Sequence, residues 1–169
     1  MYDVLAAVIS GGAIKVVDFI EDERGGKGFI KWIMALIAGL AYAYLLSFSA
    51  ASGLFLAIIA AQVFMAKVDK VSHGLAVMVA VVASLFFGIG MIDLWYLLAF
   101  FILACIDEIP LTGDLAQLGE YRLWLKGGTL SVGLITGAWT YFILLVAFDM
   151  AYLAAAHYMG EKIRPMRRR

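Results

Sequence analysis

The sequence contains a run of 35 residues, Trp32 to Ala66, that has no Asp, Glu, Lys, Arg or His. One α-helix of that length would measure about 52 Å, well beyond the bilayer's hydrocarbon core of about 30 Å. The centre of the run, Ser47 to Gly53, reads SFSAASG and is mostly small, polar and suited to a turn. We therefore predict a hairpin of two membrane helices, from about Phe29 to Phe48 and from about Ala51 to Ala66.

The composition also indicates lipid as the main solvent. Hydrophobic residues make up 64% of the 169 residues and charged residues 15%, with a mean hydropathy of +0.96. A soluble chain of this length could not bury so much apolar surface. We predict an all-α integral membrane protein, a polytopic bundle of five to six short transmembrane helices in one domain over residues 1–169. Its location is the cell membrane and its partner the lipid bilayer. The net charge of zero argues against binding to nucleic acid.

Apolar segments between polar breaks predict three more helices, from about Gly74 to Gly88, Leu94 to Ile106 and Thr129 to His157. The N-terminal segment is harder to interpret. Val4 to Ile14 is uncharged but only eleven residues long, and two glycines interrupt it. We favour a short crossing helix that ends at Asp18, and the alternative is an amphipathic helix that lies on the membrane surface.

The charged connections fall on one side of this predicted bundle. Three polar segments would share one face: Asp18–Lys31, Lys67–His73 and Asp107–Lys126. The turns at the other face, Ser47–Gly53 and Gly88–Gly90, contain no Lys or Arg, so the positive-inside rule puts the charged face in the cytoplasm. A single last crossing would, however, leave Arg167–Arg169 on the opposite side, in conflict with that rule.

Acidic residues in these connections suggest a metal site. Asp18 and Asp22 are four residues apart, so a continuing helix would present both carboxylates on one face. Neighbouring carboxylates favour a cation between them, and hard oxygen ligands suit Mg²⁺. We predict a site for a divalent metal ion, with Mg²⁺ as the preferred ion. Its ligands come from three connections: Asp18, Asp22, Asp69 and Asp107. The alternative is an acidic helix end that faces water, with Arg24 and Lys27 as counter-charges.

Asp69 and His73 repeat the four-residue spacing and are the predicted catalytic pair. His73 would move a proton while Asp69 orients its ring. Arg122 would bind a phosphate through parallel N–H donors, and Lys70 would assist as a point charge. A plain loop between helices would explain Asp69 and His73 as well. Arg122 would equally well anchor an interfacial helix.

Three further acids are of interest. Glu108 adjoins Asp107 at the C-terminal end of a predicted helix, where a carboxylate faces the negative end of the helix dipole. Asp149 lies inside the last predicted helix, towards its far end, and an ionisable group there is a functional candidate. Asp93 precedes the helix that begins at Leu94 and is predicted to cap it.

Together these residues favour a membrane-embedded, metal-dependent enzyme that acts on a phosphate- or diphosphate-bearing lipid at the cytoplasmic face, by phosphoryl or prenyl transfer. The Asp18/Asp22 spacing resembles the acidic pairs that hold Mg²⁺-diphosphate in membrane prenyltransferases and CDP-alcohol phosphotransferases. The longer signatures of those families are absent, so no membership is inferred. The substrate would be a phospholipid or an isoprenoid. The alternatives are a small ion or metal transporter or channel and a non-catalytic membrane subunit, and a homo-oligomer is compatible with each.

Overall fold

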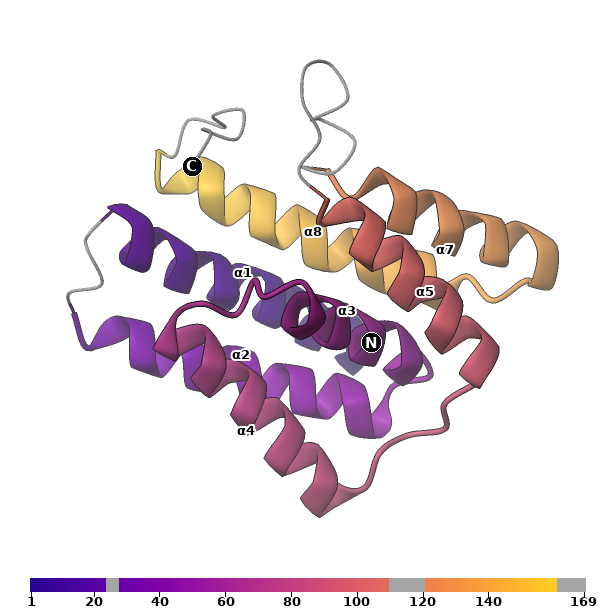
Figure 1. Ribbon diagram of the computed structural model, residues 1–169, viewed down its shortest axis with the longest axis horizontal. Helices are drawn as coiled ribbons and strands as arrows, with labels where there is room; N and C mark the ends of the chain where they lie inside the picture. The colour runs from indigo at the N-terminus through magenta and orange to yellow at the C-terminus, as the bar shows by residue number, and fades with distance from the viewer. Residues whose placement is uncertain (24–27, 110–120, 161–169) are drawn as a thin grey trace.

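The computed structural model describes residues 1–23, 28–109 and 121–160 (Figure 1). The described part of the chain contains seven α-helices and no strand. The helices are α1 (Tyr2–Glu23), α2 (Ile30–Phe48), α3 (Ser52–Phe64), α4 (Val71–Phe87), α5 (Leu94–Asp107), α7 (Leu123–Thr136) and α8 (Thr140–Tyr158). The all-helical prediction is therefore confirmed for these residues.

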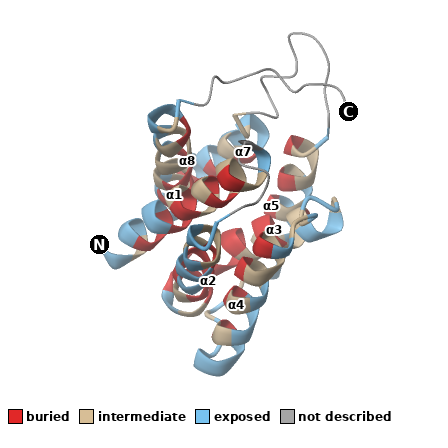
Figure 2. Cartoon of the chain, turned by 90° about the vertical axis from the view of Figure 1, so that its left-hand side faces the viewer, coloured by how far each residue is buried: buried red, intermediate tan, exposed pale blue. Residues whose placement is uncertain are grey.

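The helices form a bundle in which α1 lies between α2 and α8 (Figure 1). On one side α2 packs against α4, and on the other side α8 packs against α7, which in turn contacts α5. Helix α3 contacts both α2 and α5 and so joins the two sides. The buried residues lie on the sides of the helices that face one another (Figure 2). Three phenylalanines from different helices, Phe55, Phe100 and Phe148, are among the largest fully buried side chains.

Contacts between helix ends bring most of the charged connections to one end of this bundle, which we call the charged end. Glu21 near the end of α1 accepts hydrogen bonds from Lys31 of α2 and from Ser72 of α4. Lys67 Nζ, in the connection after α3, lies 3.5 Å from Oε2 of Glu108, which follows α5. At the opposite end, Asp3 accepts hydrogen bonds from Tyr44 and Ser49. For their described residues, these contacts bear out the prediction that the charged segments meet at one end of the bundle.

The first helix is longer than expected. The prediction was a short helix that ends at Asp18, but α1 continues from Tyr2 to Glu23. The glycines inside it do not end the helix. A Cβ atom built on Gly11 would lie 2.2 Å from the backbone oxygen of Phe148 in α8, so Gly11 lets the two helices approach closely.

The predicted single helix from Thr129 to His157 is wrong. The chain turns at Gly137, whose φ of 76° is the left-handed conformation that glycine adopts without steric cost, and α7 and α8 lie on either side of that turn. As a result α8 returns to the charged end, where Tyr152 contacts Asp18 of α1. The conflict of Arg167–Arg169 with the positive-inside rule was argued from a single last helix, which is not observed. These three residues themselves lie outside the described part of the chain.

The other helix boundaries lie within three residues of the expected ones. The predicted cap is confirmed: Asp93 Oδ1 accepts hydrogen bonds from the backbone N–H groups of Trp95 (2.8 Å) and Tyr96 (3.3 Å). These bonds satisfy donors that the first turn of a helix leaves without partners.

Two of the described helices, α2 and α8, are long and apolar enough to cross a membrane. The apolar helices α3, α4 and α5 are shorter, with 13, 17 and 14 residues. Core helices of soluble proteins can reach the same length and hydropathy, so two such helices support membrane association only weakly. The described residues thus form seven helices, of which two have the dimensions of a span, where the prediction was a bundle of five to six crossing helices.

Candidate functional site

A cavity of about 470 Å³ opens at the charged end of the bundle. This volume lies within the range of about 300–1,000 Å³ that is typical of small-molecule sites. The charged side chains that line it come from four separate parts of the chain: Asp18, Asp22, Lys67, His73, Glu108 and Arg122. The uncharged polar side chains that line it are Tyr42, Gln62 and Tyr152, and the apolar ones are Ile14, Ile59, Val68, Ala76, Val77, Ala80 and Phe148. The cavity therefore combines charged, polar and apolar groups.

The closest polar contacts in the cavity surround the Asp18 carboxylate. His73 Nε2 lies 2.5 Å from Asp18 Oδ1 as an ion-pair contact, and Tyr152 Oη donates a hydrogen bond of 2.6 Å to Oδ2. The side chains of His73 and Asp18 are 17% and 22% exposed, so water reaches both only in part. A carboxylate beside an imidazole stabilises its protonated form and fixes its orientation, so this pair has the arrangement of a general acid–base group.

The carboxylate that contacts His73 is that of Asp18, not the predicted Asp69. Asp69 precedes α4, which begins at Val71, so the four-residue spacing does not bring Asp69 and His73 together on a helix face. The Asp69 side chain is 61% exposed and lies 3.8 Å from Lys70 Nζ. Neither Asp69 nor Lys70 lines the cavity. In the connection between α3 and α4, Lys67 is the cation that lines the cavity.

Arg122 lies at the cavity, directly before α7, in a left-handed backbone conformation with φ of 50°. Such a conformation is costly for a residue with a side chain and persists only where its surroundings hold it. The guanidinium lies over the Phe148 ring, with Cζ of Arg122 5.6 Å from the ring centroid. Nη1 is buried and donates no hydrogen bond, and its nearest acid, Asp149 Oδ1, is 3.7 Å away. Arg122 therefore retains an N–H donor at the cavity wall for an anionic ligand.

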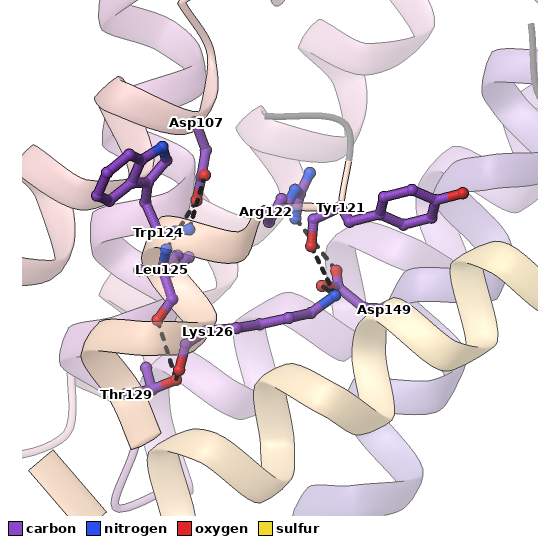
Figure 3. A network of polar contacts seen from close by, with 8 residues as sticks. All are labelled: Asp107, Tyr121, Arg122, Trp124, Leu125, Lys126, Thr129 and Asp149. Atoms are coloured by element: carbon purple, nitrogen blue, oxygen red, sulfur yellow. Dashed lines mark hydrogen bonds and ion pairs between the residues drawn. The ribbon is translucent and has the colours of Figure 1, made fainter. Parts of the chain in front are cut away.

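Arg122, Lys126 and Asp149 form a cluster of three charges (Figure 3). Lys126 Nζ lies 2.8 Å from Asp149 Oδ2 and also donates a hydrogen bond of 2.7 Å to the backbone oxygen of Tyr121. Burial disfavours the charged guanidinium, but the negative charges of Asp149 and other nearby groups outweigh this effect and raise the pKa of Arg122. One carboxylate thus faces two cations, and the cluster carries a surplus positive charge.

The sequence suggested that Asp149 lies near the far end of its helix, and the structure shows that it does not. Because the chain turns at Gly137, the helix begins at Thr140 and Asp149 is the tenth of its 19 residues. Its side chain is only 10% exposed. The three-charge cluster therefore lies half-way along α8, inside the bundle.

Asp107 does not line the main cavity. It caps α7, although it lies well before that helix in the sequence (Figure 3). Its two carboxylate oxygens accept hydrogen bonds from the backbone N–H groups of Trp124 (3.1 Å) and Leu125 (2.8 Å). The residue directly before α7, Arg122, has no side-chain capping bond. Asp107 thus supplies the cap that the local sequence lacks, at the positive end of the helix dipole.

We expect Asp107→Ala to lower the free energy of unfolding by about 1–2 kcal/mol, since it removes both capping bonds. Asp107→Asn should cost less because the amide oxygen still accepts one bond. Denaturant unfolding of the purified protein in mild detergent measures the difference. Asp69→Ala is the matched control and should stay within about 0.5 kcal/mol of the wild type, because Asp69 is exposed. Equal effects of the two alanine variants would contradict the capping role.

The predicted metal ligands do not fit a metal site formed by the protein alone. Within the described ranges, no three His, Cys, Asp or Glu residues are arranged to hold a metal ion. Asp18 and Asp22 line the cavity, but both oxygens of Asp18 already contact His73 and Tyr152. Asp69 and Asp107 are engaged elsewhere. The structure thus brings together Asp18, Asp22, His73, Glu108 and Arg122 from the predicted set.

Tyr152 is the site residue that the sequence analysis missed. It lies three residues after Asp149 in α8, a spacing that puts both on neighbouring positions of one helix face. A tyrosine at that distance from an acid inside a predicted membrane helix was an available signal. Its partner, Asp18, is 134 residues away in the sequence, so no local pattern identifies the contact.

Comparisons with protein-family models, with curated protein sequences and with solved structures found no match for this chain. The functional argument therefore depends on the geometry of the cavity.

Proposed function

We propose that this chain is a multi-pass membrane protein, with its charged end in the cytoplasm, that catalyses phosphoryl transfer from a phosphate-bearing lipid. The single observation that carries the enzymatic part is the shared cavity: the Asp18–His73 pair and the free N–H donor of Arg122 line the same space. The first group can move a proton, and the second can bind a phosphate oxygen.

Apolar side chains on the outer faces of the bundle support the membrane assignment. Phe86 of α4 and Ile135 of α7 are 85% and 82% exposed, and large apolar side chains are exposed on α2 and α5 as well. Exposure of this extent is unfavourable in water and favourable in lipid. A tilted or locally thinned bilayer accommodates the shorter helices. The lack of Lys and Arg in the turns at the opposite end supports the orientation.

In the proposed reaction His73 accepts the proton of an attacking hydroxyl group, from water or from an alcohol. The attacking oxygen forms a bond to phosphorus while the bond between phosphorus and the leaving oxygen breaks. Asp18 stabilises the imidazolium that results, and Tyr152 holds Asp18 in place through its hydrogen bond. Arg122 donates to a phosphate oxygen as negative charge develops there. The leaving oxygen then takes the proton back from His73.

The test compares His73→Gln with His157→Gln in protein reconstituted in lipid nanodiscs. Release of inorganic phosphate is measured with farnesyl diphosphate and with phosphatidic acid as substrates. We expect His73→Gln to lower the rate by about 10²–10⁴-fold, the usual contribution of a general base, with little change in substrate binding. His157 is exposed near the end of α8 and does not line the cavity, so His157→Gln should keep the wild-type rate.

Two results would contradict the proposal. One is a His73→Gln rate equal to that of the wild type. The other is that the wild-type protein turns over neither of the two substrates. Thermal unfolding of each variant, measured beside the rates, separates a loss of catalysis from a loss of folding.

A transporter is the second candidate, because the Arg122–Lys126–Asp149 cluster lies at the midpoint of α8, as a charge relay across a membrane would require. The enzyme is favoured over it, since the core between this cluster and the opposite end contains large, fully buried apolar side chains, among them Leu45, Leu54 and Phe55, and no buried charged side chain in the described residues other than those of Lys15, Asp107 and Asp149. The polar lining thus extends from one end only.

A further inference from the structure

We infer that Tyr42 of α2 and Gln62 of α3 bind the phosphate group together with Arg122, at a site inside the bundle and not at its charged end. This inference rests on the proposed function, which assigns the phosphate to Arg122. It adds two ligand-binding residues and the depth at which the anion is held.

Tyr42 is a buried residue with a polar group at the cavity. It is 5% exposed and lines the cavity wall. Its ring packs against Phe55 and Phe148, but its hydroxyl group forms no hydrogen bond with any described residue. A buried hydroxyl group without a partner costs free energy, so its place in the cavity lining indicates a bond to a ligand.

Tyr42 and Arg122 meet at the ring of Phe148. The ring centroid of Phe148 lies 5.8 Å from that of Tyr42 and 5.6 Å from Cζ of Arg122. Nη1 of Arg122 is buried and donates no hydrogen bond within the described residues. Helix α2 leaves the charged end at Lys31, and Tyr42 lies about 16 Å further along it at 1.5 Å per residue. The two donors therefore share a part of the cavity that is well inside the bundle.

Gln62 is the third side chain of this group. Gln62 and Arg122 line the main cavity together and also a smaller recess beside it, with Leu125. The Gln62 side chain is partly buried, and its amide has no hydrogen-bond partner in the part of the chain that the structure describes. An amide nitrogen, a phenol and a guanidinium can all donate to oxygen, and the phosphate oxygens are strong acceptors. Donors from three separate elements thus line one space beside Phe148.

The distribution of charge in the cavity decides the sign of the ligand at this position. Two of the three carboxylates in its lining contact His73 or Lys67. The third, that of Asp22, is exposed near the end of α1, at the charged end. The three-charge cluster around Arg122, in contrast, carries a surplus positive charge inside the bundle. An anion is therefore stabilised beside Arg122 more than near the opening.

The test measures binding of inorganic phosphate and of dodecyl phosphate to the full chain in lipid nanodiscs, against empty nanodiscs. We expect Tyr42→Phe and Gln62→Leu each to weaken binding of both probes about tenfold or more, the usual effect of one lost hydrogen bond to a charged group. Tyr42→Phe should leave the melting temperature of the ligand-free protein unchanged or higher, because the hydroxyl group that it removes has no partner in the described residues.

The matched control is Tyr44→Phe, two positions further along the same helix. The Tyr44 hydroxyl group donates to Asp3 at the opposite end of the bundle and does not line the cavity. Its removal should alter neither affinity. A loss of affinity in Tyr44→Phe equal to that in Tyr42→Phe would contradict a specific role of Tyr42.

The arms separate the inference from the proposed function. If Arg122→Gln weakens binding of both probes but either Tyr42→Phe or Gln62→Leu changes neither affinity, this inference is wrong, while the proposed phosphate site stands. A lower melting temperature of ligand-free Tyr42→Phe would assign its hydroxyl group a structural role and would also overturn the inference. If Arg122→Gln leaves both affinities unchanged, or the wild type binds neither probe, the proposed site itself is wrong.

The two probes also distinguish the source of the phosphate. Dodecyl phosphate that binds much more tightly than inorganic phosphate identifies a lipid head group as the ligand, in support of both proposals. Equal affinities, both lowered by Tyr42→Phe, identify the free anion as the ligand. That result would confirm the oxyanion site and contradict the lipid substrate of the proposed function.

Discussion

Asp149→Ala is expected to lower the free energy of unfolding by about 3–5 kcal/mol, the largest single effect in this protein. Asp149 is the only carboxylate within 4 Å of Lys126 in the described part of the chain, and it is also the nearest acid to Arg122. The three side chains are between 10% and 20% exposed, so water screens their charges poorly. Removing the acid leaves two cations inside the bundle without a counter-charge, which costs far more than a surface ion pair.

Lys126→Met is the matched comparison. It removes one charge of the cluster but leaves Arg122 and Asp149 as a balanced pair, so it should cost about 1–2 kcal/mol, well below the cost of Asp149→Ala. The double variant should then be less destabilised than the sum of the two single variants, by about 0.5–3 kcal/mol. Denaturant unfolding in mild detergent gives all three values. Small and equal effects of both single substitutions would mean that the cluster is hydrated and contributes little.

Gly11→Ala should destabilise the protein by about 1–3 kcal/mol, although alanine is the better helix former. The added Cβ would lie 2.2 Å from the backbone oxygen of Phe148, and backbone cannot move aside as the end of a flexible side chain can. The helices α1 and α8 must therefore separate. This displacement would also loosen the contact between Asp18 and Tyr152, which joins the same two helices.

Gly12→Ala is the control, in the next position of the same helix. No atom lies within 4 Å of a Cβ built there, so the higher helix propensity of alanine should leave the stability unchanged or raise it by up to about 1 kcal/mol. Thermal unfolding of the two variants under identical conditions measures the contrast. If both lower the melting temperature equally, the close approach of α1 and α8 does not limit residue size at position 11.

Local patterns in the sequence were sufficient for much of the secondary structure. The charge-free run with SFSAASG at its centre predicted α2, the turn and α3, and the observed boundaries lie within two residues of the expected ones. Asp93 was identified as a cap because capping depends on neighbours two and three residues away. Charges at the ends of apolar segments also predicted that Asp18, His73 and Arg122 would meet at one end of the bundle. The helices, the turn and the cap depend on interactions that are short in sequence, and the meeting of the charged ends follows from the alternating direction of successive helices.

Packing between distant helices decided the rest, because it depends on how each helix is rotated and how closely its neighbours approach. The turn at Gly137 put Asp149 at the midpoint of α8 and opposite Lys126. The rotation of α1 against α4 paired His73 with Asp18 instead of Asp69, and α8 supplied Tyr152 to the same carboxylate. Asp107 became a helix cap because α7 begins beside the end of α5. Helix periodicity specifies which residues share a face but not which face meets which neighbour, so these contacts emerge only from the assembled bundle.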